Sequence, residues 1–194
     1  IRDRFQVYGI PYNLTDRFSL STSPPVKAIL GFLEIIENDY YYKNIFRALS
    51  SGFLQSMKID LSHLLKASAE LKIISGYQNW VEKISAAINY PESDAIQKND
   101  SKSIKSYQNA LTDLRKIEQQ LKPFSGKLKP DEFRERLLDL IFKLNLPKIL
   151  LNATANIAEN DTIAFNTFLK VLDEVISLTK LEYGNEEKFS IYFY

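Results

Sequence analysis

The 194-residue sequence contains no cysteine and a single histidine, His63. Without cysteine the chain can form no disulfide bond and no thiolate metal site, and it has no thiol nucleophile. One histidine is too few for a zinc site with several imidazole ligands. It also makes a histidine-based catalytic triad an unfavoured interpretation. The apolar runs all fall short of the roughly 20 residues that cross a bilayer. We therefore expect a cytoplasmic protein with no membrane partner and no metal site.

Glycine and proline are also scarce, with six and seven residues, which argues against a fibrous or low-complexity chain. The total charge is small as well, because 25 basic and 24 acidic side chains leave a formal net charge of +1. A uniformly basic, histone-like nucleic-acid binder is therefore excluded. The charge is uneven, however. Residues 98–129 hold eight basic and three acidic residues, a local +5, whereas residues 130–194 hold seven basic and eleven acidic residues, a local −4.

The sequence lacks the motifs that carry common enzyme chemistry. It contains no phosphate loop of the form G-x-x-x-x-G-K-[ST], no G-x-G-x-x-G, no H-E-x-x-H and no G-x-S-x-G. A cluster of carboxylates follows Pro130: Asp131, Glu132, Glu135 and Asp139. Basic side chains alternate with them, so a solvated ion-pair face near a helix start is favoured over a carboxylate-based enzyme. We predict no catalytic residue and no cofactor in this chain.

Apolar periodicity predicts a mainly α fold, with roughly seven or eight helices after a short one at residues 2–8. Helices are expected at about residues 2–8, 24–37, 41–49, 61–75, 80–90, 104–122, 130–146, 149–157 and 161–183. The helices at 24–37 and 41–49 should form a hairpin. Short extended segments are expected at 10–14 and 188–194, and a polar loop at 92–100. Three residues are predicted to cap helix starts: Ser23, Asp60 and Asp161.

Three features of the sequence have both a structural and a functional interpretation. His63 lies beside an apolar stripe containing Leu64 and is expected to be a partly buried packing residue rather than a ligand. Trp80 recurs with Ile84 at helical spacing, which predicts a core position. At least one ring of residues 40–42 should be exposed or contact a neighbouring module, with base stacking as the less favoured reading.

A row of lysines marks the start of the longest predicted helix. Lys98, Lys102 and Lys105 are spaced at i, i+4 and i+7, so they should project from one side, away from the apolar stripe. Such a row can follow a phosphate backbone by Coulomb attraction and counterion release. With Arg115 and Lys116, these residues are our candidate nucleic-acid contacts. The alternative is that they only keep the helix soluble.

The first 50 residues contain short motifs that resemble those of a known family. The resemblance is carried by Gly9-Ile10-Pro11-Tyr12, Asp16-Arg17-Phe18-Ser19-Leu20 and Ser23-Pro24-Pro25-Val26. These segments resemble the second helicase half of UvrD/Rep-type superfamily 1 DNA helicases, above all the AddB and RecB-like helicase-nuclease branch. Residues 42–49, Trp80 and residues 123–126 are similar to the helical accessory insertion of such proteins, usually called 2B.

The resemblance implies a domain organisation. Residues 1–20 would be the edge of a RecA-like helicase core, residues 21–184 the helical accessory domain, and residues 185–194 a strand returning toward the core. Because the sequence begins at Ile1 rather than Met and its last residues are strongly apolar, we expect it to be part of a longer protein.

The resemblance also implies a function. It is that of a non-catalytic accessory domain of an ATP-dependent DNA helicase or helicase-nuclease in recombination and repair, which guides duplex DNA or regulates the motor. The implied partners are duplex or single-stranded DNA, the rest of the helicase chain and a partner nuclease subunit. The ATP and magnesium sites of the family, and its nuclease motif, have no matching positions here, so these cofactors are expected only in the longer protein. The alternative is a helical protein-interaction or structural domain without DNA contact, which docks through Phe189, Ile191 and Phe193.

Overall fold

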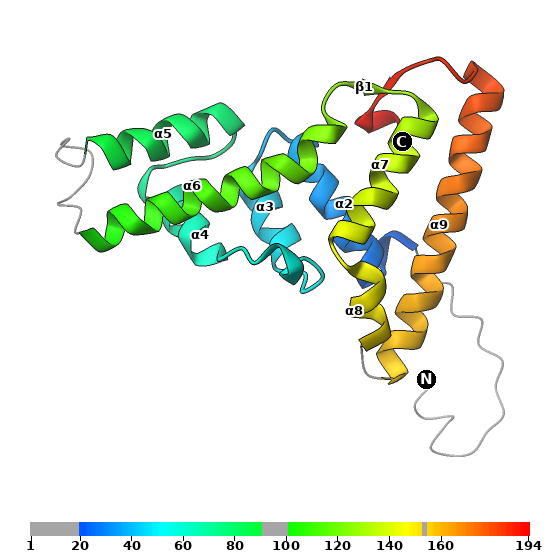
Figure 1. The fold of residues 1–194 in the computed structure, drawn as a ribbon, viewed down its shortest axis with the longest axis horizontal. Helices are drawn as coiled ribbons and strands as arrows, with labels where there is room; N and C mark the ends of the chain where they lie inside the picture. The colour runs from blue at the N-terminus through cyan, green and yellow to red at the C-terminus, as the bar shows by residue number, and fades with distance from the viewer. Residues whose placement is uncertain (1–19, 91–100, 153–154) are drawn as a thin grey trace.

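The structure is a computed structural model that describes residues 20–90, 101–152 and 155–194. Within these ranges the chain forms eight α-helices and one two-stranded sheet, which confirms the mainly α prediction (Figure 1). The helix predicted at residues 2–8, the strand at 10–14 and the loop at 92–100 lie outside the described residues. No helix of the described ranges is both long and apolar enough to cross a lipid bilayer.

The elements follow the predicted order with small shifts of their bounds. The helices are α2 (Pro24–Glu37), α3 (Tyr42–Leu49), α4 (Leu61–Glu70), α5 (Tyr77–Asn89), α6 (Ser101–Leu121), α7 (Pro130–Lys143), α8 (Leu146–Asn152) and α9 (Ala155–Tyr183). The strands are β1 (Lys127–Leu128) and β2 (Phe189–Ser190). Short 3-10 helices lie at Leu20–Thr22, Gln55–Met57, Lys122–Phe124 and Ile191–Phe193.

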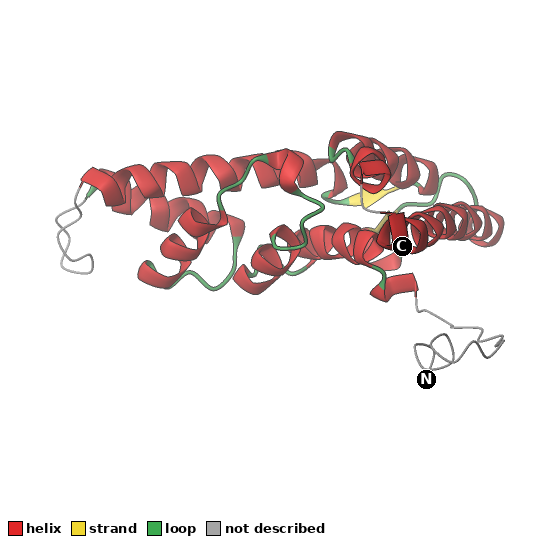
Figure 2. Cartoon of the chain, turned by 90° about the horizontal axis from the view of Figure 1, so that it is seen from below, coloured by secondary structure: helices red, strands yellow, loops and turns green. Residues whose placement is uncertain are grey.

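The helices form an elongated body with two lobes (Figures 1 and 2). In the first, the α4–α6 lobe, α4 and α5 pack against the long helix α6. In the second, the α7–α9 lobe, α7 and α8 pack against α9. The predicted α2–α3 hairpin lies between them, and α2 also contacts α9. One continuous apolar core runs through the whole body, from Ile29 in α2 to Ile176 in α9.

The turn of the α2–α3 hairpin has an uncommon backbone conformation, and hydrogen bonds attach it to the α4–α6 lobe. Asp39 and Tyr40 have positive φ angles of 47° and 55°. The carbonyl of Tyr40 accepts a 2.9 Å hydrogen bond from the indole N–H of Trp80, and the carbonyl of Asp39 accepts one from the Gly76 amide at 2.6 Å. Trp80 is fully buried, as predicted. These bonds satisfy buried polar groups that would otherwise destabilise the turn.

Of the three predicted helix caps, one is confirmed, one holds the predicted position without a capping bond, and one is wrong. The Asp60 cap is confirmed, because its Oδ1 accepts a 2.9 Å hydrogen bond from the Ser62 amide. Ser23 makes no capping bond, and its buried hydroxyl has no partner. A cap side chain accepts from the amide at the second or third helical position. The second is Pro25, which has no N–H, and the third, Val26, does not donate to Ser23. Asp161 lies inside α9, because α9 begins at Ala155 rather than after a helix over 149–157. Residues 155–160 contain no proline or glycine that would interrupt a helix.

The C-terminal segment forms a shorter strand than predicted. Only Phe189 and Ser190 pair, antiparallel to β1, with Leu128 opposite Phe189. β1 offers two residues because Pro130 opens α7 directly after it. The rest of the segment packs on the helices through aromatic rings. The Tyr194 ring stacks on Phe133 with centroids 4.2 Å apart.

Candidate nucleic-acid interface

The predicted lysine row lies on α6, the long helix of the α4–α6 lobe. Lys98 is outside the described residues. Lys102, Lys105 and Arg115 are exposed, and Lys116 is half-buried. At about 100° per residue, Lys105 and Lys116 project about 20° apart and Lys102 about 60° away, whereas Arg115 is turned about 80° to the other side. Three of the described candidates therefore share one side of α6, and Arg115 does not.

Helix α4 runs antiparallel to α6, and two further lysines, one in α4 and one just before it, lie where the two helices meet. At one end, the Lys66 Nζ donates to the Ser103 hydroxyl at 2.9 Å and lies 5.8 Å from the centre of the Tyr107 ring. At the other end, the Lys58 carbonyl accepts from the Lys116 Nζ at 3.3 Å, and the Lys58 side chain is exposed. We did not predict Lys58 or Lys66 from the sequence, because only packing of α4 on α6 brings them beside the row.

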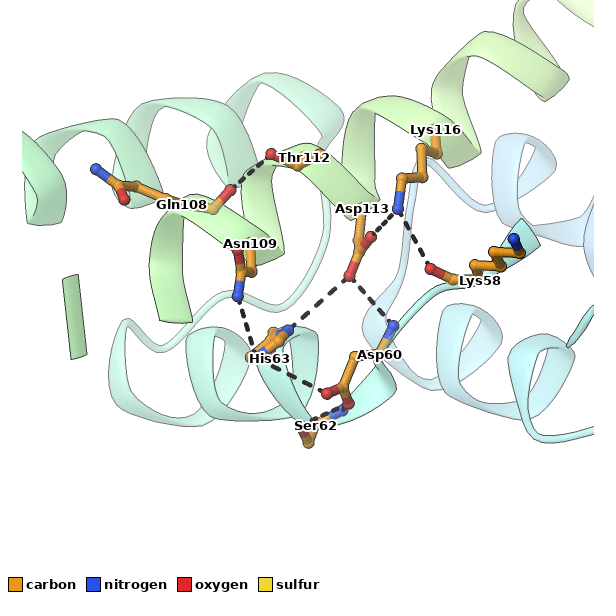
Figure 3. Close-up of polar contacts among 9 residues, drawn as sticks. All are labelled: Lys58, Asp60, Ser62, His63, Gln108, Asn109, Thr112, Asp113 and Lys116. Carbon is orange, nitrogen blue, oxygen red and sulfur yellow. Dashed lines mark hydrogen bonds and ion pairs between the residues drawn. The ribbon is translucent and has the colours of Figure 1, made fainter. Parts of the chain in front are cut away.

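A buried carboxylate, Asp113, organises the contact between α6 and the start of α4 (Figure 3). Its residue exposure is 5%. One oxygen accepts from the Lys116 Nζ at 2.7 Å, and the other accepts from the Asp60 amide at 3.2 Å. Because Asp60 itself caps α4, Asp113 ties the first turn of α4 to the middle of α6. The ammonium of Lys116 is therefore partly neutralised by a structural partner.

His63 lies in the same polar cluster (Figure 3). Its Nε2 is 3.5 Å from the Asn109 amide nitrogen and 3.8 Å from an Asp60 carboxylate oxygen, and its Nδ1 is 4.0 Å from Asp113. The predicted partial burial of His63 is confirmed, but its neighbours are polar rather than an apolar packing surface. Asn109 and Asp113 are distant in sequence and lie beside His63 because α4 packs on α6. The apolar stripe around His63 could not predict these polar neighbours.

The cluster is not arranged to bind a metal ion. Asp60 and Asp113 approach different nitrogens of the His63 ring, so their oxygens do not converge on one coordination position. Across the described residues no group of three or more histidine, aspartate or glutamate side chains could hold a metal. Hydrogen bonds from the Ser62 hydroxyl and amide hold the pKa of Asp60 below its usual value, so this cap stays ionised to lower pH than an ordinary aspartate.

Two of the four carboxylates after Pro130, Asp131 and Asp139, form ion pairs on an exposed face, as predicted. Asp131 pairs with Lys180 at 2.9 Å, and Asp173 pairs with Arg134 at 2.6 Å, so both pairs join α7 to α9. Asp139 pairs with Lys143 within α7 at 2.6 Å. These carboxylates are solvent-exposed and each has a cationic partner, which is the arrangement of a solvated helix face.

A separate hollow of about 540 Å³ lies between α2 and α3. An ion pair between Arg47 and Glu34 spans it, and Lys27 lines one side. The carboxylate and the two cations leave it with a weak net charge. None of the candidate nucleic-acid contacts lines it.

Comparison with known proteins gives a consistent set of relatives. No family model matches the chain. The chain is 24% identical over 200 residues to the B subunit of the ATP-dependent helicase/deoxyribonuclease of Clostridium botulinum (strain Hall), covering 96% of this chain and 16% of that protein. These relatives are helicase-nuclease subunits. The corresponding subunit of Thermoanaerobacter sp. (strain X514) is 22% identical over 196 residues, which cover 98% of this chain and 17% of the relative.

A third relative, the same subunit of Caldanaerobacter subterraneus subsp. tengcongensis, is 24% identical over 194 residues. The chain spans only 16–17% of the length of these curated relatives. The similarity extends over nearly the whole chain, and it supports the helicase-nuclease part of the resemblance. The assignment to a UvrD-type 2B insertion stays a prediction.

Proposed function

We propose that this chain is a non-catalytic helical domain of an ATP-dependent helicase-nuclease subunit, and that its α4–α6 lobe holds DNA by the phosphate backbone. The observation that carries the DNA part is the cationic seam, defined here as Lys58, Lys66, Lys102, Lys105 and Lys116. Lys102, Lys105 and Lys116 share one side of α6. Lys66 of α4 and Lys58 of the segment before it lie where this part of the chain contacts α6. ATP and magnesium would act elsewhere in the longer protein, and the division into residues 1–20, 21–184 and 185–194 belongs to the same proposal.

The dimensions of the seam suit a polyanion rather than a small anion. Lys102 and Lys116 are 14 residues apart on α6, or about 20 Å along the helix axis. A DNA strand carries one phosphate per 3.4 Å of duplex axis, so the seam extends along about six phosphates. Within the described chain, Lys102 and Lys105 have no acidic partner and can give up bound counterions to a phosphate. Backbone contacts of this kind carry no sequence information, as expected for a domain that guides any duplex past a motor.

Rigid-body rotation of the domain about its chain connections is the second part of the proposal. A domain that binds the duplex beside a motor can couple DNA position to motor activity if it has two orientations. The continuous core supports movement of both lobes as one unit, because separating them would expose apolar surface.

Salt-dependent binding of a fluorescent duplex and of the matching single strand tests the DNA part. The double variant Lys102→Glu/Lys105→Glu reverses the two unpaired lysines of the seam. We expect binding to weaken at least tenfold, and the slope of log affinity against log salt to fall by about two. The matched control is Lys27→Glu/Lys148→Glu, which makes the same charge change at two exposed positions away from the seam. Absence of binding at low salt, or an equal loss in the control, overturns DNA contact through the seam.

The alternative, a helical interaction domain without DNA contact, predicts no response to DNA at any salt concentration. Two residues of its expected docking surface, Phe189 and Ile191, are only partly available to a partner, because they are half-buried within the domain itself. The Phe189 ring stacks on Phe193 with centroids 4.0 Å apart. Changes at these positions would therefore disturb folding as well as association.

A further inference from the structure

Helix α9 is apolar on two opposite sides. Its inner side contributes Phe165, Leu172 and Ile176 to the core. The helix lies at the edge of the molecule (Figures 1 and 2). Its outer side exposes large apolar residues. Their exposed fractions are 57% for Ile163, 39% for Val171, 63% for Leu178 and 85% for Leu181. At about 100° per residue these four lie within an arc of about 80°, on the side opposite Leu172.

The outer side has the spacing of a coiled-coil seam. Steps of three and four residues connect six positions, which we call the outer stripe: Ala164, Thr167, Val171, Glu174, Leu178 and Leu181. A stripe with this spacing packs against another helix by inserting side chains between those of its partner. A shallow hollow of about 480 Å³ lies in the middle of the stripe, lined by Asp173, Glu174, Ser177 and Leu178.

The outer stripe is complementary to itself when two copies run antiparallel. If Val171 of one copy faces Glu174 of the second, the same register places Thr167 opposite Leu178 and Ala164 opposite Leu181. A two-fold axis repeats each layer, as a closed symmetric dimer requires. Every large apolar residue of the stripe then lies within the interface.

Charge complementarity favours the same register. Neither Lys170 nor Glu174 has an ion-pair partner within the described chain. Lys170 directly precedes Val171, so its ammonium reaches the Glu174 of the second copy in this register. Because the dimer is two-fold symmetric, this Lys170–Glu174 ion pair forms twice in the interface. Without a counter-charge, a glutamate enclosed between apolar layers would oppose association.

We propose that the outer stripe of α9 binds a second copy of this chain as an antiparallel helix pair. The exposed apolar residues of the stripe, with Ile163 beside it, offer about 500 Å² per copy, a patch size typical of interaction sites. Two facing copies bury at most about 1,000 Å², below the standard size of specific interfaces, which corresponds to a weak, reversible dimer. The proposal does not depend on DNA binding, because the seam lies on the other lobe.

A charge-swap series measured by analytical ultracentrifugation tests the interface. We expect a reversible monomer–dimer equilibrium for the 194-residue chain. Lys170→Glu and Glu174→Lys should each weaken dimerisation at least tenfold, and the double variant Lys170→Glu/Glu174→Lys should restore it. Leu178→Glu should abolish it with an unchanged circular dichroism spectrum, because the side chain is exposed in the monomer. Lys148→Glu, an exposed lysine off the stripe, is the matched control.

Cysteine cross-linking tests the orientation with a clean background, because the chain has no native cysteine. A mixture of Ala164→Cys and Leu181→Cys variants should form the mixed disulfide faster than either variant links to itself. Preferential Ala164→Cys self-linking indicates a parallel pair and overturns the proposed register. A chain that stays monomeric up to about 1 mM overturns the proposal, since a cover for the stripe must then come from another protein segment.

Discussion

Removing the carboxylate of Asp113 should destabilise the domain well beyond an ordinary surface substitution. In Asp113→Ala, the Asp60 amide loses its acceptor at 3.2 Å, and an unpaired, partly buried donor costs about 1–3 kcal/mol. The Lys116 side chain is 42% exposed and can rehydrate, so its lost ion pair adds only about 0–1 kcal/mol. The expected loss is about 2 kcal/mol, or about 4–8 °C in Tm for a chain of this length.

Urea denaturation followed by circular dichroism measures this loss. Asp113→Asn keeps an acceptor for the Asp60 amide and should lose about half as much as Asp113→Ala. Gln119→Ala, an exposed position on the same helix, is the control and should change the stability by less than about 0.5 kcal/mol. A loss below about 0.5 kcal/mol for Asp113→Ala would refute the role we assign to this carboxylate. The same variant frees the Lys116 ammonium, so duplex binding at low salt should tighten if the cationic seam contacts phosphates.

Three further predictions concern single sites elsewhere in the fold. Burial raises the pKa of Asp161, so the native state favours its neutral form and gains stability as pH falls; Asp161→Asn should raise Tm at pH 7 but not at pH 3. Burial, with a smaller contribution from Glu132, raises the pKa of Tyr194 to about 12, so stability should fall between pH 10 and 12, and urea denaturation should show less of this loss in Tyr194→Phe. Gly76→Ala should cost about 1–3 kcal/mol in urea denaturation, because its φ is +88° and a Cβ would lie 3.2 Å from the Asn79 Cβ; an unchanged midpoint would contradict this.

The sequence predicted the helices well where apolar spacing and a stop residue agreed. Helix α2 begins at the Pro24-Pro25 pair and ends at Glu37 as expected, and Gly184 follows the end of α9 with a φ of +90°. The prediction from the sequence failed where the conformation depends on pairing with a distant strand. The strand expected over 188–194 depends on β1, which is two residues long.

The candidate site was only partly predictable for the same reason. The spacing of Lys102 and Lys105 placed them on one exposed side of α6. The spacing could not show that Lys116 is held by Asp113, or that Lys66 and His63 lie beside the row, because these contacts depend on how α4 packs against α6. Asp113 lies four residues before Ile117, on the inner side of α6, but a carboxylate at such a position gives no expectation of burial without its partners.

The anchoring of the last residues determines how tension applied there would travel. The Tyr194 hydroxyl donates to the Leu128 carbonyl at 3.0 Å, and the Tyr192 hydroxyl donates to the carbonyl of Glu37 at the end of α2. A pull on residue 194 must break these attachments, the ring stack on Phe133 and the β1–β2 pairing before it straightens residues 184–188. The load therefore enters α2 and α7, and it reaches only the last turn of α9, through the Tyr183 ring that contacts Phe189 and Phe193.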